Sequence, residues 1–384
     1  MHITGLSYKH SLLFLGLLFS NLLVAQVTIV VHGIPKNTPE NDQLYISGNF
    51  EGWTGGQEAY RLTPKEDAYK IDIPAATGSI EFKFTRGSWD SVELDANGNQ
   101  LDNRSYSFSG KSDTLRFDIA HWADLSPKKS TASSNVHLLD DSFDMFPLEK
   151  KRQVWIYLPK NYQNAEKRYP VLYMHDGQNL FDQSSSYSGE WEVDETLDRL
   201  QASGTLEIIV VGIDHGGGER MDEYAPWEFT SYPTKKQGDA YVQFIQKNLK
   251  PYVDNNFRTL SDRDHTGIMG SSLGGLISFY AALKYPETFG IAGVFSPSFE
   301  MSTPSLNFAG EQGNTQHVRM YLMAGDNESG QMVEKMNQVV ELMKGAGFPE
   351  DNISSKVVQK GEHNEKLWRE QFEQAVLWLF KDNI

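Results

Sequence analysis

Residues 265–275 read His265-Thr-Gly-Ile-Met-Gly-Ser-Ser-Leu-Gly-Gly275, and this stretch decides the fold of the second half of the chain. A short apolar segment precedes the glycine-rich turn, and an apolar helical pattern (276–284) follows it. Gly-x-Ser-x-Gly between a strand and a helix is the nucleophile elbow, a turn so tight that the residues flanking the serine must be small. Only Ser272, and not Ser271, lies between glycines two residues away on either side. Ser272 is therefore the candidate nucleophile.

Strand-like and helix-like segments alternate on both sides of this turn. After a hairpin-like stretch at 137–159, helical patterns occur at 191–200, 240–255, 276–284, 330–345 and 365–380. The strand-like stretches between them are 171–174, 207–212, 265–269, 291–295, 320–323 and 353–358. This alternation predicts a mostly parallel sheet with helices on both faces.

The first part of the chain, residues 26–123, is β-rich, and no helix is predicted in it. Turn-forming Gly, Pro, Asn and Asp separate strand-like stretches at 27–31, 43–47, 69–73, 80–84 and 114–118. This pattern predicts a small antiparallel sandwich domain. A polar stretch, 124–136, is typical of a linker, and the second domain then occupies 137–384.

Residues 1–25 are typical of a secretory signal peptide. Lys9 and His10 precede an apolar core (11–24), and Ala25 offers a cleavage site. The apolar core is short for a membrane anchor and contains Asn21. We therefore expect a secreted or periplasmic protein with no stable membrane insertion after cleavage.

Composition excludes several classes of function. The chain carries 51 acidic and 35 basic residues, a formal net charge of −16. Such a surface repels phosphate backbones, so nucleic acid is not expected as a partner. Cysteine is absent, which excludes disulfides, thiolate zinc sites and a cysteine nucleophile. Aromatic residues make up 12% of the chain, and aromatic rings are surfaces on which sugar rings can stack.

A serine nucleophile needs a histidine base that is oriented by a carboxylate. In enzymes with a nucleophile elbow, the acid and then the histidine follow the serine, each in a loop after a later strand. His363 follows the strand-like stretch 353–358, whereas His317 precedes a strand, so His363 is the candidate base. The loop after 320–323 offers Asp326 and Glu328 as the acid, and the residue types leave both open.

The oxyanion of the reaction needs two backbone N–H donors. One is expected from Leu273, the residue after the nucleophile. The other is expected from the loop after the strand at 171–174, with Gly177 and Gln178 as the candidates. This chemistry requires neither a metal nor a cofactor.

Three blocks of the second domain resemble one family. They are Tyr169-Pro-Val-Leu-Tyr-Met-His-Asp-Gly-Gln-Asn-Leu-Phe181, Ile268-Met-Gly-Ser-Ser-Leu-Gly-Gly275 and Gly361-Glu-His-Asn-Glu-Lys-Leu-Trp368. The family is that of the putative esterases, which includes esterase D, feruloyl and acetylxylan esterases, enterochelin-type siderophore esterases and mycolyltransferases. The resemblance covers about residues 135–384 and implies an α/β-hydrolase fold with a Ser–acid–His triad. The family's acid usually ends a Gly-x-x-acid pattern, which here favours Glu328 over Asp326.

The first domain resembles starch-binding modules of families 20 and 48 and the glycogen-binding domain of a kinase β subunit. The matching segments are Ile46-Ser-Gly-Asn-Phe-Glu-Gly-Trp53, Glu81-Phe-Lys-Phe-Thr-Arg-Gly-Ser-Trp89 and Leu101-Asp-Asn-Arg104. The resemblance implies that Trp53 and Trp89 stack on glucose rings while Lys83 and Asn103 bind hydroxyls. The alternative is that both tryptophans serve sandwich or interdomain packing.

Taken together, the sequence predicts a secreted serine carboxylesterase. Its expected partners are an ester substrate, with acetyl or feruloyl groups on carbohydrate, and an α-glucan or other glycan on the first domain. The alternatives are a siderophore esterase, an acyltransferase, and a glycan-binding protein with an inert hydrolase domain. The acyl group, the glycan and the oligomeric state are not determined by the sequence.

Overall fold

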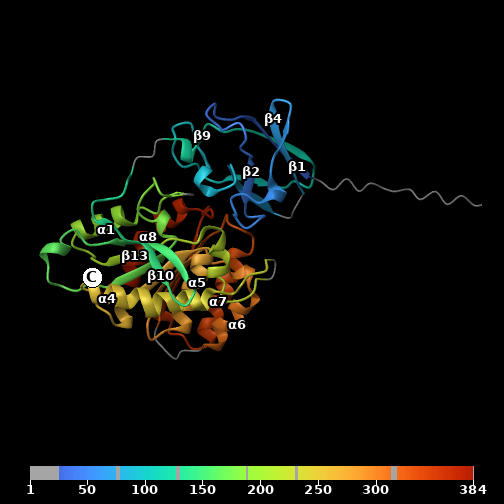
Figure 1. Ribbon diagram of the computed structural model, residues 1–384. Coiled ribbons are helices and arrows are strands. Elements are labelled where there is room, and N and C mark those ends of the chain that lie inside the picture. The colour runs from blue at the N-terminus through green and yellow to red at the C-terminus, as the bar shows by residue number, and fades with distance from the viewer. Residues whose placement is uncertain are drawn as a thin grey trace, which may run out of the picture.

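A small all-β part lies against a larger α/β part, as Figure 1 shows. The computed structural model describes residues 26–74, 78–126, 130–186, 189–229, 232–312 and 318–383. The predicted signal peptide (1–25) and His317 lie outside these residues, as does the segment 127–129 of the predicted linker. In the described ranges, no helix combines the length and the apolar character needed to cross a membrane.

The all-β part is a sandwich of two main sheets. One has the order β3-β4-β1-β8, formed by Thr63–Lys65, Ala68–Pro74, Gln26–Gly33 and Asp113–Asp118. The other has the order β2-β5-β7, formed by Tyr45–Gly48, Ser79–Thr85 and Arg104–Ser107. A short pair, β6 (Glu93–Leu94) and β9 (His121–Trp122), completes it. The pairing is antiparallel as expected, except that β1 and β8 run parallel.

Alternation along the strands of the sandwich separates its core from its outer faces, because successive side chains of a strand point to opposite sides. On β1, Val27, Ile29 and Val31 are fully buried, and Phe82 and Phe84 of β5 complete the same core. The intervening side chains of β5 therefore point away from this core.

The α/β part is built on one eight-stranded sheet of order β10-β11-β13-β12-β14-β15-β16-β17. The strands span Val136–Met145, Lys150–Tyr157, Ile209–Ile213, Val171–His175, Thr266–Ser271, Ile291–Phe295, Arg319–Gly325 and Ile353–Val358, in that order. The last six strands are parallel, and the β10–β11 hairpin joins antiparallel. Because helices cover both faces, β12 to β15 are buried along their whole length.

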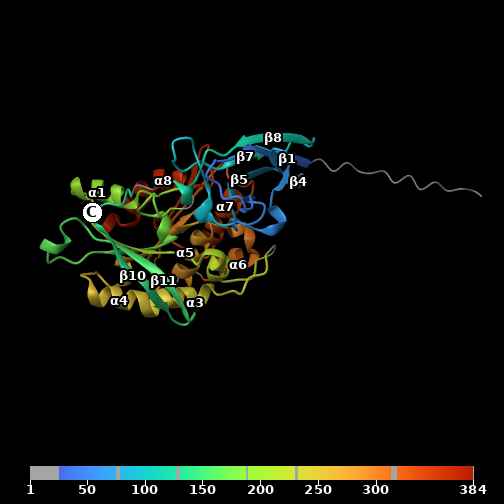
Figure 2. The same ribbon diagram turned by 45° about the horizontal axis from the view of Figure 1, so that its top comes forward.

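Figure 2 shows helices on the two faces of this sheet. On one face, α1 (Val193–Ala202) and α8 (Glu365–Leu379) pack on the even-numbered apolar residues of β12. The opposite face carries α3 (Gly238–Phe244), α4 (Lys250–Asn256), α5 (Leu273–Lys284), α6 (Thr303–Glu311) and α7 (Met332–Gly345). The α/β class with a preceding sandwich is thus confirmed. A π-helical turn (Ile245–Leu249) divides the helix predicted at 240–255, and α6 and the short α2 (Arg220–Glu223) have no predicted counterpart.

The turn between β14 and α5 is the predicted elbow. Ser272 has φ 58° and ψ −122°, a conformation that non-glycine residues rarely adopt and that is costly unless the surroundings enforce it. Close backbone packing enforces it here: a Cβ on Gly275 would lie 2.6 Å from the carbonyl oxygen of Phe295. A Cβ on Gly270 would likewise lie 2.9 Å from the carbonyl carbon of Gly274, so the glycines before and after Ser272 are required by close contacts with α5 and β15.

We predict that Gly275→Ala lowers the free energy of unfolding by about 1–3 kcal/mol, because the added methyl group meets backbone that cannot move freely. The matched control is Gly310→Ala on α6, where the nearest atom to an added Cβ is 3.9 Å away. The control should leave stability unchanged or raise it by up to about 1 kcal/mol, since alanine is the better helix former. Urea unfolding followed by circular dichroism measures both, and equal stabilities of the two variants would contradict the packing argument.

Candidate active site

A cleft of about 760 Å³ lies between the two parts of the molecule and contains the candidate nucleophile. From the α/β part, Ser272, Leu273 and His363 line it. From the sandwich, Trp53 and Trp89 line it. The candidate catalytic residues are thus enclosed by residues from both ends of the sequence.

Ser272 is half-buried at the N-terminus of α5, where the elbow holds it clear of the sheet. Among the described residues, the neighbour of its hydroxyl is Ser298 Oγ, at 3.3 Å, and no direct hydrogen bond to His363 is formed. In free enzymes such catalytic bonds are often long and shorten when substrate binds. Ser272 and His363 nevertheless line the same cleft.

Glu328 and His363 are directly bonded. The Nδ1 atom of His363 is 2.7 Å from Oε2 of Glu328, whose side chain is fully buried. The second carboxylate oxygen accepts from the Ser296 hydroxyl (2.8 Å) and from the backbone N–H of Gly325 (2.6 Å). Trp368 in turn donates to Ser296 Oγ, at 2.9 Å. These bonds leave Nε2 of the imidazole for chemistry in the cleft.

Asp326, the other candidate acid, is exposed and points elsewhere. Its carboxylate accepts from the backbone N–H of Lys360 at 2.5 Å. It therefore ties together the loops after β16 and β17, and Glu328 is the carboxylate that the fold brings to His363.

The surroundings of His363 favour its charged form. Burial alone would lower the pKa of the imidazole, but the bond to Glu328 and the nearby carboxylates of Glu81 and Glu300 raise it above its ordinary value. A charged histidine forms transiently when the base takes a proton from serine. The site is thus arranged to stabilise that state.

The predicted oxyanion-hole residues are only partly brought together. Leu273 lines the cleft at the first turn of α5, where backbone N–H groups have no helical acceptor. Gly177 and Gln178 form a buried 3₁₀ turn (Gly177–Asn179) and are absent from the cleft lining, because this turn packs on β13. The side-chain oxygen of Gln178 accepts from His215 N at 3.2 Å, so it braces a loop that does line the cleft. The second oxyanion donor, expected from the backbone N–H of Gly177 or Gln178, stays a prediction.

The predicted sugar-binding residues do not form a single face. Trp53 and Trp89 lie together in the catalytic cleft, with ring centroids 6.0 Å apart, and Trp89 Nε1 donates to the carbonyl of Trp53. Lys83 and Asn103 instead line a second, polar cavity of about 210 Å³ between the two parts of the chain. Lys83 is only 1% exposed. In the folded chain, Trp53 and Trp89 therefore face one cavity, and Lys83 and Asn103 face another.

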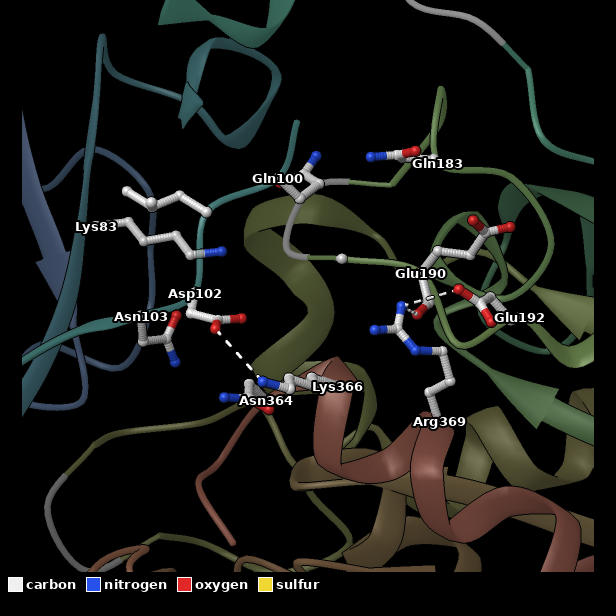
Figure 3. A pocket seen from close by; sticks show the side chains of 12 residues that line it. Lys83, Gln100, Asp102, Asn103, Gln183, Glu190, Glu192, Asn364, Lys366 and Arg369 are labelled. Atoms are coloured by element: carbon white, nitrogen blue, oxygen red, sulfur yellow. Dashed lines mark hydrogen bonds and ion pairs between the residues drawn. The ribbon is translucent and has the colours of Figure 1, made fainter. Parts of the chain in front are cut away.

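Figure 3 shows this second cavity, which α8 closes from below. Lys366 lies 3.9 Å from Asp102 of the sandwich, and Arg369 pairs with Glu192 at 3.3 Å. The Lys366–Asp102 pair and the Asn103 amide join the two parts of the molecule, whereas the Arg369–Glu192 pair lies within the α/β part.

Arg220 lines the cleft but is held by Asp176 through two bonds, of 2.7 and 2.8 Å. Among the described residues, one acidic group has metal-ligand spacing (Glu190, Asp194 and Glu195), and none of its members lines the catalytic cleft.

Two residues of the site were missed by sequence reasoning. Glu81 of β5 and Glu300 after β15 both line the cleft and face His363. Nothing in the sequence indicates that β5 faces a catalytic cleft, because that depends on how the two parts dock. Glu300 is two residues beyond Ser298, in a turn that the sequence identifies only as a loop after a strand.

The site agrees with comparisons to known proteins. Residues 147–379, more than half of the chain, match the family described as "Putative esterase", and the chain belongs to that family. The YbbA protein of Bacillus subtilis, described as uncharacterized, is 28% identical over 244 residues, covering 60% of this chain and 94% of YbbA. An endo-1,4-beta-xylanase/feruloyl esterase of Xylanibacter ruminicola is 27% identical over 232 residues, which are 59% of this chain and 29% of that protein.

The sandwich and the overall architecture also have relatives. An alpha-amylase of Niallia circulans is 34% identical over 93 residues, 24% of this chain and 7% of the amylase. This similarity lies in the N-terminal region and fits the predicted resemblance to carbohydrate-binding modules. The enterobactin esterase FES of Shigella flexneri has a similar structure, with a TM-score of 0.55 at 16% identity over 89% of each chain. At that identity the likeness shows a common fold, and the family match supports esterase activity.

The two loop carboxylates should differ sharply on substitution. We predict that Glu328→Gln lowers kcat for ester hydrolysis by on the order of 10³–10⁴-fold, because an amide cannot hold the imidazole in the required tautomer. Asp326→Asn should stay within about twofold, as for other exposed substitutions. Steady-state kinetics on a small ester measures both, with near-ultraviolet circular dichroism as the folding control. Equal losses would contradict the assignment.

Proposed function

We propose that this member of the esterase family is a secreted serine carboxylesterase that hydrolyses esters carried on neutral carbohydrates. The single observation that carries the proposal is the bond between buried Glu328 and His363 in the cleft that holds Ser272. A carboxylate, an imidazole and an elbow serine in this order are the parts of an acyl-transfer triad.

The mechanism follows from the roles of these groups. His363 takes the proton of Ser272 Oγ through Nε2 as the oxygen attacks the ester carbonyl, and Glu328 stabilises the resulting imidazolium through Nδ1. The N–H of Leu273 donates to the developing oxyanion. As the intermediate collapses, His363 gives its proton to the departing alcohol oxygen. Water, deprotonated by the same histidine, then attacks the acyl-enzyme and releases the acid and free Ser272.

The charge of the cleft favours neutral substrates. Its lining contains four carboxylates, from Glu81, Asp90, Glu300 and Glu328. The single guanidinium in the lining, Arg220, is already paired with a buried aspartate. A polyanionic ligand such as a catecholate trilactone would meet net repulsion here, and a sugar ester would not. This is the argument against the siderophore alternative.

The tryptophan pair supplies an apolar surface for a sugar ring. Trp53 and Trp89 are half-buried, so each ring keeps an accessible part in the cleft. The bond from Trp89 Nε1 to the Trp53 carbonyl (2.9 Å) and the contact of Trp89 with Gly55 fix the orientation of the indole. Flat aromatic surfaces pair with the apolar faces of pyranose rings. We infer that the sandwich binds the carbohydrate part of the substrate over the nucleophile.

The proposed nucleophile is tested by acylation. Wild type should release a burst of p-nitrophenol from p-nitrophenyl acetate, because an acyl-enzyme accumulates, and Ser272→Ala should abolish the burst. The neighbouring Ser271→Ala is the matched control and should retain it. Absence of a burst from wild type, or its survival in Ser272→Ala, would contradict the proposal.

The proposed sugar surface is tested with two substrates. Trp53→Ala and Trp89→Ala should each raise KM for a feruloylated xylo-oligosaccharide by about tenfold, the loss of one stacking contact, and leave hydrolysis of p-nitrophenyl acetate within about twofold. Tyr106→Ala, a sandwich aromatic outside the cleft lining, is the control. A catecholate trilactone is included as the anionic substrate. Preference for it over the neutral ester would overturn the charge argument.

A further inference from the structure

The sandwich touches the loop of the candidate base directly. Asn103 Nδ2 donates to the backbone carbonyl of His363, at 3.2 Å, across 260 residues of sequence. The same amide group donates to Oε2 of Glu81, at 3.3 Å. One side chain thus joins the His363 loop to a carboxylate on β5.

The backbone of Glu81 is held in this position by two hydrogen bonds to Asn49. Its backbone N–H donates to Asn49 Oδ1 and its carbonyl accepts from the Asn49 N–H, both at 3.1 Å. Its side chain is 8% exposed and lines the catalytic cleft together with His363. On β5 the apolar residues Phe82 and Phe84 point into the sandwich core, so Glu81 and Lys83 point to the α/β part. The polar face of this strand is therefore buried in the interface between the two parts of the molecule.

We propose that Glu81 and Asn103 are positioning residues for His363, so that the sandwich completes the catalytic machinery as well as binding carbohydrate. This inference rests on the proposed esterase function. Asn103 fixes the backbone of the histidine loop, and the Glu81 carboxylate stabilises the imidazolium that forms when the base takes the serine proton.

Several carboxylates surround the imidazole of His363, and they come from different parts of the chain. Glu328 is bonded to the imidazole, and Glu300 faces it from the turn after β15. Glu365 on α8 also faces it, but interacts more strongly with buried Lys83. Burial raises the pKa of Glu81, and the neighbouring imidazolium and the Asn103 amide oppose that rise. Of the carboxylates named here around His363, Glu81 is the one that the sandwich contributes.

The first test removes the charge of Glu81 and keeps its shape. Because the carboxylate raises the pKa of His363, and the base acts only when neutral, Glu81→Gln should move the acid limb of kcat/KM to lower pH by up to about one unit. The maximal kcat for p-nitrophenyl acetate should fall about three- to tenfold. Glu40→Gln, an exposed sandwich carboxylate outside the cleft, makes the same change in net charge and should leave the profile unchanged.

The second test removes the amide. Asn103→Ala should lower kcat for p-nitrophenyl acetate about three- to tenfold with KM unchanged, since the small ester does not need the sugar surface. A role limited to sugar binding would instead raise KM for the oligosaccharide ester and leave the small ester unaffected. That result would overturn the inference.

Failure of the inference is distinguishable from failure of the proposed function. An NMR titration of the His363 ring, assigned by its loss in His363→Gln, reports its pKa without any turnover. A lower value in Glu81→Gln than in wild type is expected. If wild type hydrolyses esters and the profiles and titrations of the two proteins coincide, the inference alone is wrong. If no ester is hydrolysed, the proposed function fails, and the titration still decides whether Glu81 acts on His363.

Discussion

Burying a carboxylate without hydrogen-bond donors costs free energy. In this protein the carboxylate of Glu328 is buried, and the loops around it supply the donors that it needs. Its side chain has no solvent exposure and takes hydrogen bonds from Ser296, Gly325 and His363. These donors stand after β15, at the end of β16 and after β17. Because parallel strands end at the same sheet edge, their loops meet there. The order of the strands thus brings together the members of the proposed triad, which are far apart in sequence.

The elbow imposes a second constraint on the same edge. The strained backbone of Ser272 persists because glycines on either side let β14, α5 and β15 approach closely. In return, Ser272 and Leu273 line the cleft at the start of α5, where the first N–H groups of a helix have no helical acceptor. The close packing that requires these glycines therefore also positions Ser272 in the cleft, so the same contacts serve both stability and the proposed reaction.

The sandwich is best understood through the two faces of β5. Its apolar residues form the core of the sandwich, and Glu81 and Lys83 are buried against the α/β part. Trp53 and Trp89 extend the same contact over the cleft. In sequence these residues match an open sugar-binding face, and in the folded chain that face is divided between a catalytic cleft and an interdomain cavity. The packing of the sandwich against the α/β part therefore decides which of these side chains a ligand in the cleft can reach.

The sequence by itself determined the α/β class, the elbow and the serine within it, because hydrophobic period and small-residue spacing are local properties. Chain order also indicated His363. The residue types left Asp326 and Glu328 open, and only the family resemblance favoured Glu328. The tertiary structure supplies the physical reason, since the turn after β16 points the Glu328 carboxylate inward to His363 and leaves Asp326 exposed. The partnership of Glu81 with His363 was decided by tertiary structure alone. It arises because the sandwich, with its own hydrophobic core, packs against the α/β part. The local sequence of a strand such as β5 does not indicate which surface its polar side chains will contact.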